Sequence, residues 1–580
     1  MLKKKVTPYQ SNKKTTIIIL LSILGLIVCS AILFPQIRLK ILSIVEQILR
    51  RKIVEYQAWL NVFLSYSIGG ICFILFFDYC TLTHSGRLFV HQVKQEIKDC
   101  LNEIDVRSLL KPVLLMSGVY LLGILTILRA NYLYMDDIVR SIDGFRNWYN
   151  WSRYISEFAS IFIHADINLT DISPFPQLLA VLFLAVSSVI LVYVMGNRKI
   201  TVVRLLASIP LGLSPYFLEC LSFKFDAPYM ALSILASMIP FMFVARKKAF
   251  LFCSVVCLWI MCMTYQAVSG IYLIIVIILC FQDWNSRKKT DKEILSFGGI
   301  AALAYCFAML FFSLILMKHS IHDTSATMHP LSEMIPGIWM KIQNYTMVIN
   351  QDFGLTWKIG IVLVGVLFVT KSLFVSAQKK ISAFFVSMTV IVISFILSYG
   401  VYIVLSIAEY PPRTLLGFGV FLAILCVYVV SDFKKIAVVT VLALNWCFMV
   451  FAFSYGNALA DQERYAEFRI GLLLHDLSAL FPNQSAEDMS IQLESTIDYA
   501  PSILNISKHY PVIERVVHRR LGDDFIWDIV YIRMHFNYIQ YDIIDGIQND
   551  FKPLDLPVVL DSYYHTIKSD GNRILITLKH

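Results

Sequence analysis

Long apolar runs recur along this chain and constrain its fold more than any other feature. Each run is roughly 20 residues long, the length that a helix needs to cross about 30 Å of hydrocarbon. Apolar residues make up 57% of the 580 residues, whereas a soluble globular domain holds about 45–50%. Because backbone groups inside a bilayer must bond to one another, such runs favour helices over a barrel. The sequence therefore predicts an α-helical polytopic membrane protein.

The hydropathy pattern divides the chain into three predicted regions. About thirteen membrane-spanning helices are expected, near residues 17–34, 57–78, 112–130, 176–195, 200–216, 228–245, 249–264, 267–281, 296–317, 356–375, 381–405, 414–431 and 436–455. Residues 1–111 form a transmembrane hairpin with interfacial helices, and residues 112–455 form the main bundle with its loops. Hydropathy stays low over residues 456–580, which indicates a soluble domain.

The predicted soluble domain is a small α/β unit. It begins with the helical pattern NALADQERYAEFRIGLLLHDL and ends with two expected strands, PVVLDSYYHTI and RILITLK. Ser569–Asn572 joins the two strands, and Asp-Gly between β-branched runs is typical of a hairpin turn. Nothing in this domain indicates catalysis.

Short basic loops predict the orientation of the bundle. They read GNRK, ARKK, SRKKTDKE, SAQKK and SDFKK, and they alternate with less basic loops. By the positive-inside rule the basic loops are cytoplasmic, so the remaining loops and the C-terminal domain lie outside the cytoplasm. The formal net charge of +9 is spread over these loops, so we interpret it as a topology signal and expect no nucleic-acid partner.

Two N-terminal segments are amphipathic. Ile37–Tyr56 carries a basic cluster on what should be the outer side; either it lies along the interface as a surface helix, or residues 1–56 are on the other side of the membrane. Gly86–Lys111 places apolar residues at helical spacing between charges, which predicts an interfacial helix at an anionic leaflet.

Unusual polar residues gather in the outer loops. The first such loop contains Asp136 and Asp137, then Arg140 and Arg153 among aromatic residues that include Trp148. Later loops supply Lys224, Asp226, Gln266 and Arg413. These residue types suit transfer of a sugar from a lipid phosphate. A carboxylate can deprotonate an acceptor hydroxyl, cations can neutralise a departing phosphate, and aromatic rings can stack on sugars.

Each of these residues also has a plain structural interpretation. Trp and Tyr at helix ends are ordinarily interface anchors, and Asp136 could cap a short helix. The Asp–Arg spacing in the first loop could make a surface pair, and Lys224 with Asp226 could be a structural pair. His319, His322 and His329 match metal-ligand spacing only weakly, so no metal site is predicted.

The ordered set of outer loops resembles the GT-C glycosyltransferases and, among them, the Gtr-type serotype-converting glucosyltransferases that modify bacterial O-antigen. The matching residues are Asp136, Asp137, Arg140, Gly144, Trp148 and Arg153 in the first loop, Ser222, Lys224 and Asp226 in the second, and more loosely Tyr265–Gln266 and Arg413. The chain departs from the pattern at Ser152, where a glycine is expected, and in its extra helices before residue 112.

The resemblance implies a GT-C-like bundle in the bacterial inner membrane with its active site facing the periplasm. The expected partners are membrane lipids, undecaprenyl-phosphate-glucose as donor and lipid-linked O-antigen as acceptor; the product is the glucosylated O-antigen of serotype conversion. Asp137 or Asp136 would be the base, with Asp136 favoured as the positioning residue. Arg140, Lys224 and Arg413 would contact the donor phosphate, Asp226 would hold Lys224 or the acceptor, and Trp148, Arg153 and Gln266 would complete the substrate site. No cofactor is predicted, and a divalent ion bridging the acidic pair is compatible but not predicted.

Two other functions stay open from the sequence. A lipid-linked oligosaccharide flippase or other transporter would be expected to carry charges near the midplane of its helices, and the predicted helices hold almost no acids. An O-antigen polymerase would use the same loop acids and arginines, so the residues do not separate it from a glucosyltransferase. The oligomeric state is not visible in the sequence.

Overall fold

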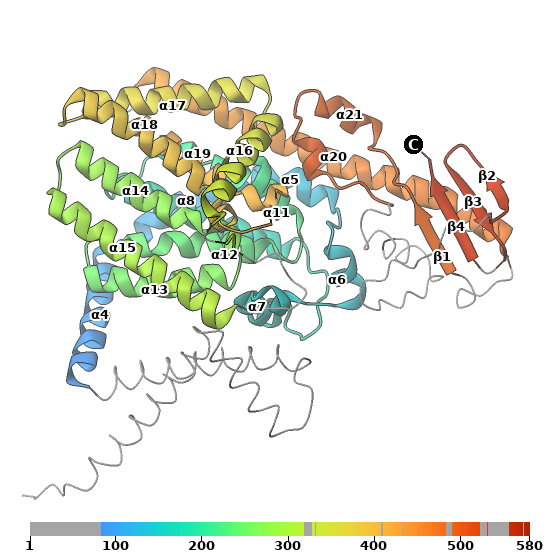
Figure 1. Cartoon of the computed structure of the whole chain (residues 1–580), viewed down its shortest axis with the longest axis horizontal. Coiled ribbons are helices and arrows are strands. Elements are labelled where there is room, and N and C mark those ends of the chain that lie inside the picture. Colours follow the sequence, from blue (N-terminus) through green and yellow to red (C-terminus); the bar gives the residue numbers. More distant parts are fainter. Residues whose placement is uncertain are drawn as a thin grey trace, which may run out of the picture.

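The computed structural model describes residues 83–317, 328–330, 332–407, 410–432, 434–482, 490–521, 531, 556–571 and 573–579. Two parts are evident in Figure 1: a bundle of roughly parallel helices, and a small domain with a β-sheet held beyond one end of the bundle. The chain is therefore a mostly helical membrane protein with a small mixed α/β domain, as its hydropathy predicts.

The bundle is built from helices of very different lengths. Its long helices are α5 (Val106–Ala130), α8 (Phe175–Met195), α13 (Lys247–Cys262), α14 (Gly270–Asn285), α15 (Asp291–Phe311), α16 (Met334–Asp352), α17 (Leu355–Val375), α18 (Lys380–Leu397), α19 (Gly417–Val429) and α20 (Lys435–Leu480). Shorter pieces lie between them: α9 (Val202–Ala207), α10 (Pro210–Leu213), α11 (Pro215–Ser222), α12 (Ala227–Met238), η3 (Ile239–Phe243), η4 (Gln266–Val268), η5 (Phe312–Leu316), η6 (Gly400–Ile403), η7 (Pro412–Leu415) and η8 (Val430–Asp432).

Within the described ranges, eight helices are long and apolar enough to span a membrane, or nine if the bent pair Val202–Leu213 and Pro215–Ser222 counts as one span. The expected number of about thirteen is therefore not confirmed. The first two predicted spans lie outside the described residues. Two more, Ala227–Phe243 and α13, form apolar helices that are shorter than a full crossing. Pro240 interrupts the first of these helices, Ala227–Phe243, because proline lacks the amide hydrogen that would continue a regular α-helix.

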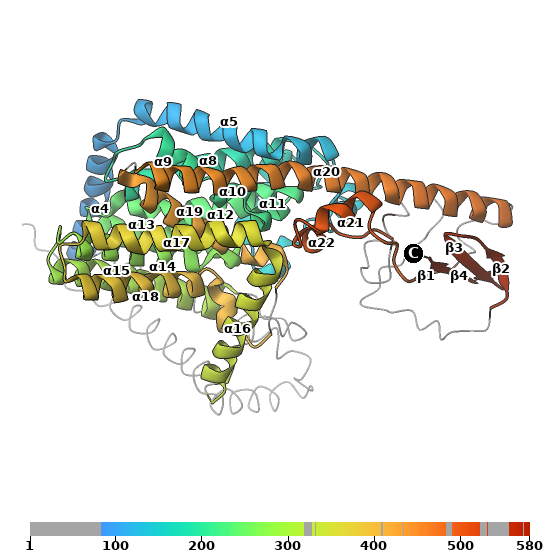
Figure 2. The ribbon, with the colours of Figure 1, turned by 90° about the horizontal axis from the view of Figure 1, so that it is seen from above.

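Helix α20 connects the two parts of the molecule. It runs for 46 residues without a break, which corresponds to about 69 Å, and Figure 2 shows it extending from the bundle into the small domain. It approaches α5 closely at Gly456, where a Cβ atom would lie 2.5 Å from the backbone nitrogen of Ile127. The hydroxyl of Thr126 also donates to the carbonyl of Ala452 (3.2 Å). Any residue larger than glycine at position 456 would push these two helices apart.

One amphipathic segment predicted at the N-terminal side is a separate helix. Helix α4 (His84–Glu103) is capped by Thr83, whose side chain accepts a hydrogen bond from the amide of Gly86. It ends before α5 starts at Val106. It crosses the general direction of the bundle helices at the end away from the small domain (Figure 1). The other amphipathic segment, Ile37–Tyr56, lies outside the described residues.

The small domain contains a four-stranded sheet in the order β1-β4-β3-β2. Its elements are β1 (Ser490–Glu494), α21 (Pro501–Ser507), α22 (Ile513–Val516), β2 (Val558–Asp561), β3 (His565–Ser569) and β4 (Arg573–Leu578). The antiparallel pairing of β3 with β4 confirms the predicted hairpin, and Gly571 adopts a φ of 110° in its turn. The prediction of one continuous strand over residues 557–567 is wrong. The amide and hydroxyl of Ser562 bond the carbonyl of His565, which folds the segment into a second hairpin.

Three short helices lie between α5 and α8 in the chain, and one of them, α6 (Asp137–Asp143), lies between the bundle and the small domain in Figure 1. The other two are η2 (Trp148–Trp151) and α7 (Tyr154–His164). This connection carries the acidic pair, so the fold places that pair where the bundle meets the small domain.

Candidate active site

The acidic pair lies at a sharp change of chain direction. Helix α5 ends at Asn131, which adopts a left-handed φ of 49°, and α6 ends at Gly144, with a φ of 66°. A Cβ atom at Gly144 would lie 3.1 Å from the carbonyl oxygen of Leu169, so glycine suits both the backbone angle and the close approach. These two turns fix the short helix that carries Asp136 and Asp137.

Asp137 is fully buried. Its Oδ2 atom accepts the backbone amides of Tyr134 (3.1 Å) and Lys224 (2.9 Å), while Oδ1 is buried without a hydrogen-bond partner. Burial raises the pKa of Asp137 to about 7, against the lowering effect of the two amides and of Arg140. Asp137 therefore joins the loop after α5 to the loop after α11 through the backbone amide of Lys224, 87 residues away in the sequence.

Asp136 is more accessible than its neighbour. It precedes α6, is only partly buried and makes no hydrogen bond that caps the helix. Its charge acts on two guanidinium groups, those of Arg140 and Arg413. The more accessible carboxylate of the pair thus lies within the electrostatic field of two cations from different loops.

Arg140, Asp226 and Trp148 form one buried cluster. The guanidinium of Arg140 pairs with one oxygen of Asp226, and the indole N–H of Trp148 donates to the other. Arg140 also lies 4.4 Å from the centroid of the Trp148 ring, and Tyr229 packs against the same ring at a centroid distance of 5.2 Å. Trp148 is only 1% exposed, so in this structure its face is covered and does not offer a platform for a sugar.

Lys224 does not pair with Asp226, contrary to one of the expected roles of Asp226. Its ammonium group bonds the carboxylate of Asp171 (2.9 Å) and the side-chain oxygen of Asn131 (2.7 Å). Burial opposes ionisation of Asp171, but hydrogen bonds from Ser173 and Lys224 outweigh it and lower the pKa of Asp171. A small cavity of about 90 Å³ beside Lys224 is lined also by Asn131 and by Leu459 of α20.

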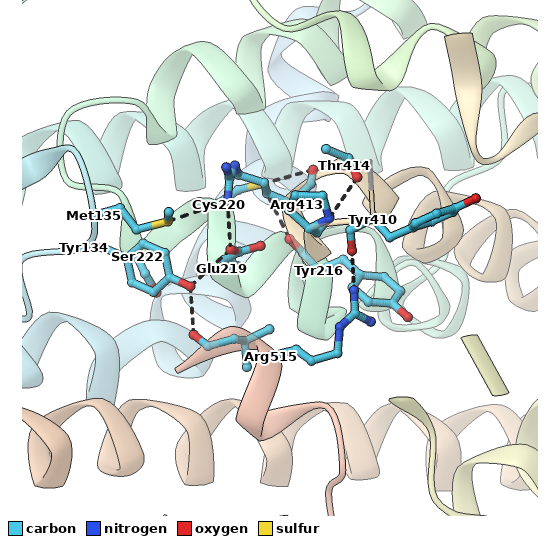
Figure 3. A network of polar contacts seen from close by, with 12 residues as sticks. Tyr134, Met135, Tyr216, Glu219, Cys220, Ser222, Tyr410, Arg413, Thr414 and Arg515 are labelled. Atoms are coloured by element: carbon cyan, nitrogen blue, oxygen red, sulfur yellow. Dashed lines mark hydrogen bonds and ion pairs between the residues drawn. The ribbon is translucent and has the colours of Figure 1, made fainter. Parts of the chain in front are cut away.

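Arg413 belongs to a second buried network, shown in Figure 3. Its guanidinium lies 3.4 Å from a carboxylate oxygen of Glu219 and 3.6 Å from the sulfur of Met135, the residue before the acidic pair. The hydroxyl of Tyr134 donates to the same oxygen of Glu219 (3.1 Å). The side chain of Arg413 is 28% exposed, whereas that of Glu219 is 2% exposed, so Arg413 is the member of this network that can reach a ligand.

The remaining predicted residues border these networks. The guanidinium of Arg153 lies 4.8 Å from the centroid of the Tyr265 ring, and the hydroxyl of Tyr265 donates to the carbonyl of Arg413 (3.2 Å). The side-chain amide of Gln266 donates to the backbone carbonyl of Trp151 (3.2 Å). Trp151 itself is 54% exposed. Ser152 adopts a φ of 58°, a left-handed angle that favours glycine and accounts for the glycine expected there.

The small domain contacts the segment that leads into the acidic pair. The carbonyl of Val516 accepts the hydroxyls of Tyr134 (3.0 Å) and Tyr455 (3.1 Å), and that of His518 accepts the hydroxyl of Tyr132 (2.8 Å). Arg520 is fully buried, lies 4.1 Å from the centroid of the Tyr132 ring and bonds the carbonyl of Leu133. The domain therefore holds residues 132–134 from the side opposite the bundle.

The nine residues singled out in the sequence thus lie along one chain of contacts, drawn from four loops. Four further participants were not among them: Asn131, Tyr134, Asp171 and Glu219. Glu219 is visible in the sequence as a rare acid in an apolar helix, which is a usable signal. Asp171 carries no comparable signal. Within the described ranges no group of three His, Cys, Asp or Glu side chains could hold a metal ion, and His319 and His322 lie outside those ranges.

A helical membrane bundle whose acids and arginines gather at one end, beside a small cavity, is the arrangement expected of an integral membrane glycosyltransferase, and the family match gives that class. The chain belongs to the GtrII glucosyl transferase family: the family model described as Glucosyl transferase GtrII matches residues 125–430, which confirms the resemblance. The chain is also 23% identical, over 444 residues, to an uncharacterized 55.3 kDa protein in the gtrB 5′ region of Salmonella phage P22, covering 72% of this chain and 89% of that protein. No solved structure matches the chain.

Proposed function

We propose that the protein transfers glucose from undecaprenyl-phosphate-glucose to a hydroxyl of lipid-linked O-antigen, on the periplasmic face of the bacterial inner membrane. Membership of a glucosyl transferase family supports the sugar. The observation that carries the proposal is the convergence of a carboxylate, Asp136, with Arg140 and Arg413 at one end of a membrane bundle. That end suits a donor whose phosphate lies at headgroup depth and whose tail lies in lipid.

The distribution of basic loops supports the periplasmic side. The turn between α14 and α15 and the turn between α17 and α18, which carry SRKKTDKE and SAQKK, lie at the end of the bundle away from the small domain (Figure 2). Under the positive-inside rule this basic end faces the cytoplasm. Asp136, at the opposite end, would then face the periplasm together with the small domain.

Accessibility assigns different roles to the two acids. A general base must come within hydrogen-bond reach of the acceptor hydroxyl, and both oxygens of Asp137 are buried. Asp136 is therefore the base in this proposal, and Asp137 is the positioning residue that holds the Lys224 loop. This reverses the order that the sequence favoured, because the sequence does not show which of two adjacent carboxylates is buried.

The transfer is a single displacement. The acceptor oxygen attacks the anomeric carbon and its proton passes to Asp136. The bond from that carbon to the phosphate oxygen breaks, and its electron pair leaves with the phosphate. Arg413 is the best-placed cation for that charge because it is partly exposed, whereas Arg140 and Lys224 are themselves buried and already paired with carboxylates. One displacement inverts the configuration of the sugar.

A reconstituted assay tests the donor and the acceptor together. The full chain in proteoliposomes would be given radiolabelled glucosyl polyprenyl phosphate and a lipid-linked oligosaccharide. The proposal predicts a product heavier by one hexose, formed without a nucleotide sugar. Joining of two oligosaccharide units would instead identify a polymerase, and movement of the lipid-linked glycan without a new linkage would identify a transporter.

A further inference from the structure

A large cavity lies at the end of the bundle away from the acidic pair. Its volume is about 740 Å³, and it is lined by the ends of α8, α13, α14 and α17 and by neighbouring residues of α9, α15 and α19. Figure 2 shows these helix ends on the side opposite the small domain. None of its lining residues belongs to the networks around Asp136 and Arg413, so the cavity is separate from the candidate active site.

The lining carries an excess of positive charge. It includes six cationic side chains and two carboxylates; the cations are Arg198, Arg204, Lys247, Lys288, Lys289 and Lys371. Two of the six have acidic partners: Lys289 pairs with Asp283 (2.7 Å), and Arg198 pairs with Glu103 (3.0 Å). The other lining carboxylate, Glu293, accepts the amide and hydroxyl of Thr290.

Arg204, Lys247 and Lys288 lack a carboxylate partner within the part of the chain that the structure describes. Arg204 donates to the carbonyls of Lys199 (2.9 Å) and Ser431 (3.0 Å). Lys247 donates to the hydroxyl of Ser296 (3.1 Å). The carbonyls hold the guanidinium in place without neutralising it, so the cavity keeps a positive field that favours an anion.

Part of the lining is apolar. It is formed by side chains that include Phe241, Phe250, Phe297 and Ile300. Phe297 and Ile300 belong to α15, a candidate span whose other side chains, such as Leu303, are largely exposed. A ligand that matches both the cations and the apolar side chains has an anionic head and an apolar part.

The positive-inside rule explains basic loops but does not explain this arrangement. It requires Lys and Arg in loops near the membrane, not their convergence on one cavity. Arg204 lies in α9 and Lys371 lies in α17, one turn before the end of that helix. Charged side chains that face the interior of a membrane bundle are expensive and ordinarily mark a binding site.

We propose that this cavity binds a phosphate-bearing amphiphile, with the phosphate among Arg204, Lys247 and Lys288 and the apolar part against the phenylalanines. The site is independent of glucosyl transfer at the other end of the bundle. A membrane phospholipid and a soluble phosphate compound share the anionic chemistry, so the test must separate the two sources.

The test measures binding to the purified, delipidated full chain. The probes are phosphatidylglycerol, inorganic phosphate, and diacylglycerol, which lacks the phosphate. The test variant is the double substitution Lys247→Gln with Lys288→Gln, because both side chains are exposed at the rim. Arg204 is left intact because it holds main-chain carbonyls. The matched control is Lys199→Gln, an exposed lysine at the same end of the bundle that does not line the cavity.

Saturable binding of phosphatidylglycerol is expected, weakened roughly 10- to 30-fold in the double variant and unchanged in the control variant, since each cation contributes about 1 kcal/mol toward an anionic headgroup. Weaker binding of inorganic phosphate, with the same sensitivity to the double variant, would also support the site, because this probe lacks the apolar part. Inorganic phosphate that binds as tightly as phosphatidylglycerol would overturn the assignment of an amphiphile and identify a soluble phosphate as the ligand. Equal binding of diacylglycerol, or equal effects of the control and double variants, would overturn the proposal.

Discussion

Replacing Asp137 by asparagine is predicted to make the protein more stable at alkaline pH. The pKa of this carboxyl rises from 3.8 to about 7 because the group is buried. At about 1.4 kcal/mol per pKa unit, the ionised form costs about 4 kcal/mol at pH 8 and about 2 kcal/mol at pH 5.5. Because the folded state holds the proton of Asp137 more tightly than the unfolded state does, this carboxyl does not lower the free energy of unfolding below about pH 4. Its destabilising effect grows as the pH rises and levels off above about pH 7.

The asparagine removes the buried charge but introduces a smaller destabilisation, that of an unpaired amide group. Its carbonyl can still accept the amides of Tyr134 and Lys224, but its amide group would replace Oδ1, which has no hydrogen-bond partner. An unsatisfied buried donor costs about 1–3 kcal/mol. The net gain is therefore about 1–3 kcal/mol at pH 8 and close to zero at pH 5.5.

Thermal unfolding in detergent, followed by tryptophan fluorescence, measures this difference. The melting temperature of Asp137→Asn relative to the unsubstituted protein should rise between pH 5.5 and pH 8. Asp143→Asn is the matched control, because it removes an exposed carboxylate at the end of the same helix and leaves the buried one in place. A rise of the same size in this control would show that the effect does not come from the buried carboxyl. A variant that is less stable than the unsubstituted protein at pH 8 would refute the reasoning, since it would mean that the fold requires the anion.

Three further predictions concern the surroundings of the acidic pair. Arg413→Gln, made together with Glu219→Gln so that no buried acid loses its partner, should lower kcat/KM for the lipid donor about 100- to 1000-fold. The single variant Glu219→Gln should lose less activity than this double variant, and equal losses in the two would show that Arg413 does not contact the donor phosphate. Trp151→Ala should raise the KM for the acceptor while kcat is kept, because its exposed ring is the available sugar platform; a change in kcat alone in initial-rate measurements would count against this role. Arg520→Met should lower the melting temperature and the transfer rate together, because Arg520 fixes the residues that lead into Asp136; unchanged values of both would show that the small domain does not brace the site.

The class of fold could be predicted because it depends on apolar runs within the sequence. Runs of apolar residues are local, and each is long enough to be recognised without its partners. Helices that stop short of a full crossing are less visible, since Ala227–Phe243 is apolar, as a span is, but shorter. Likewise the sequence does not show that α20 continues as one helix beyond the predicted boundary at residue 456.

The candidate site was visible as a set of residue types but not as a set of pairs. Loops at the same end of a bundle meet in space, so Asp137 and Lys224 could be expected near each other. Their actual connection uses the backbone amide of Lys224, which has no sequence signal. The partner of Lys224 is Asp171 rather than Asp226, and the ring of Trp148 is covered by Arg140. Such choices depend on side-chain direction, which spacing in a loop does not determine.

The most direct test of the account compares Asp136→Asn with Asp137→Asn in a single-turnover assay with glucosyl polyprenyl phosphate and lipid-linked acceptor. If Asp136 is the base, Asp136→Asn should slow transfer by about 100- to 10,000-fold without changing the melting temperature. Asp137→Asn should be affected less, because it keeps its main-chain contacts. Transfer at the normal rate by Asp136→Asn would contradict the central claim that this carboxylate takes the acceptor proton.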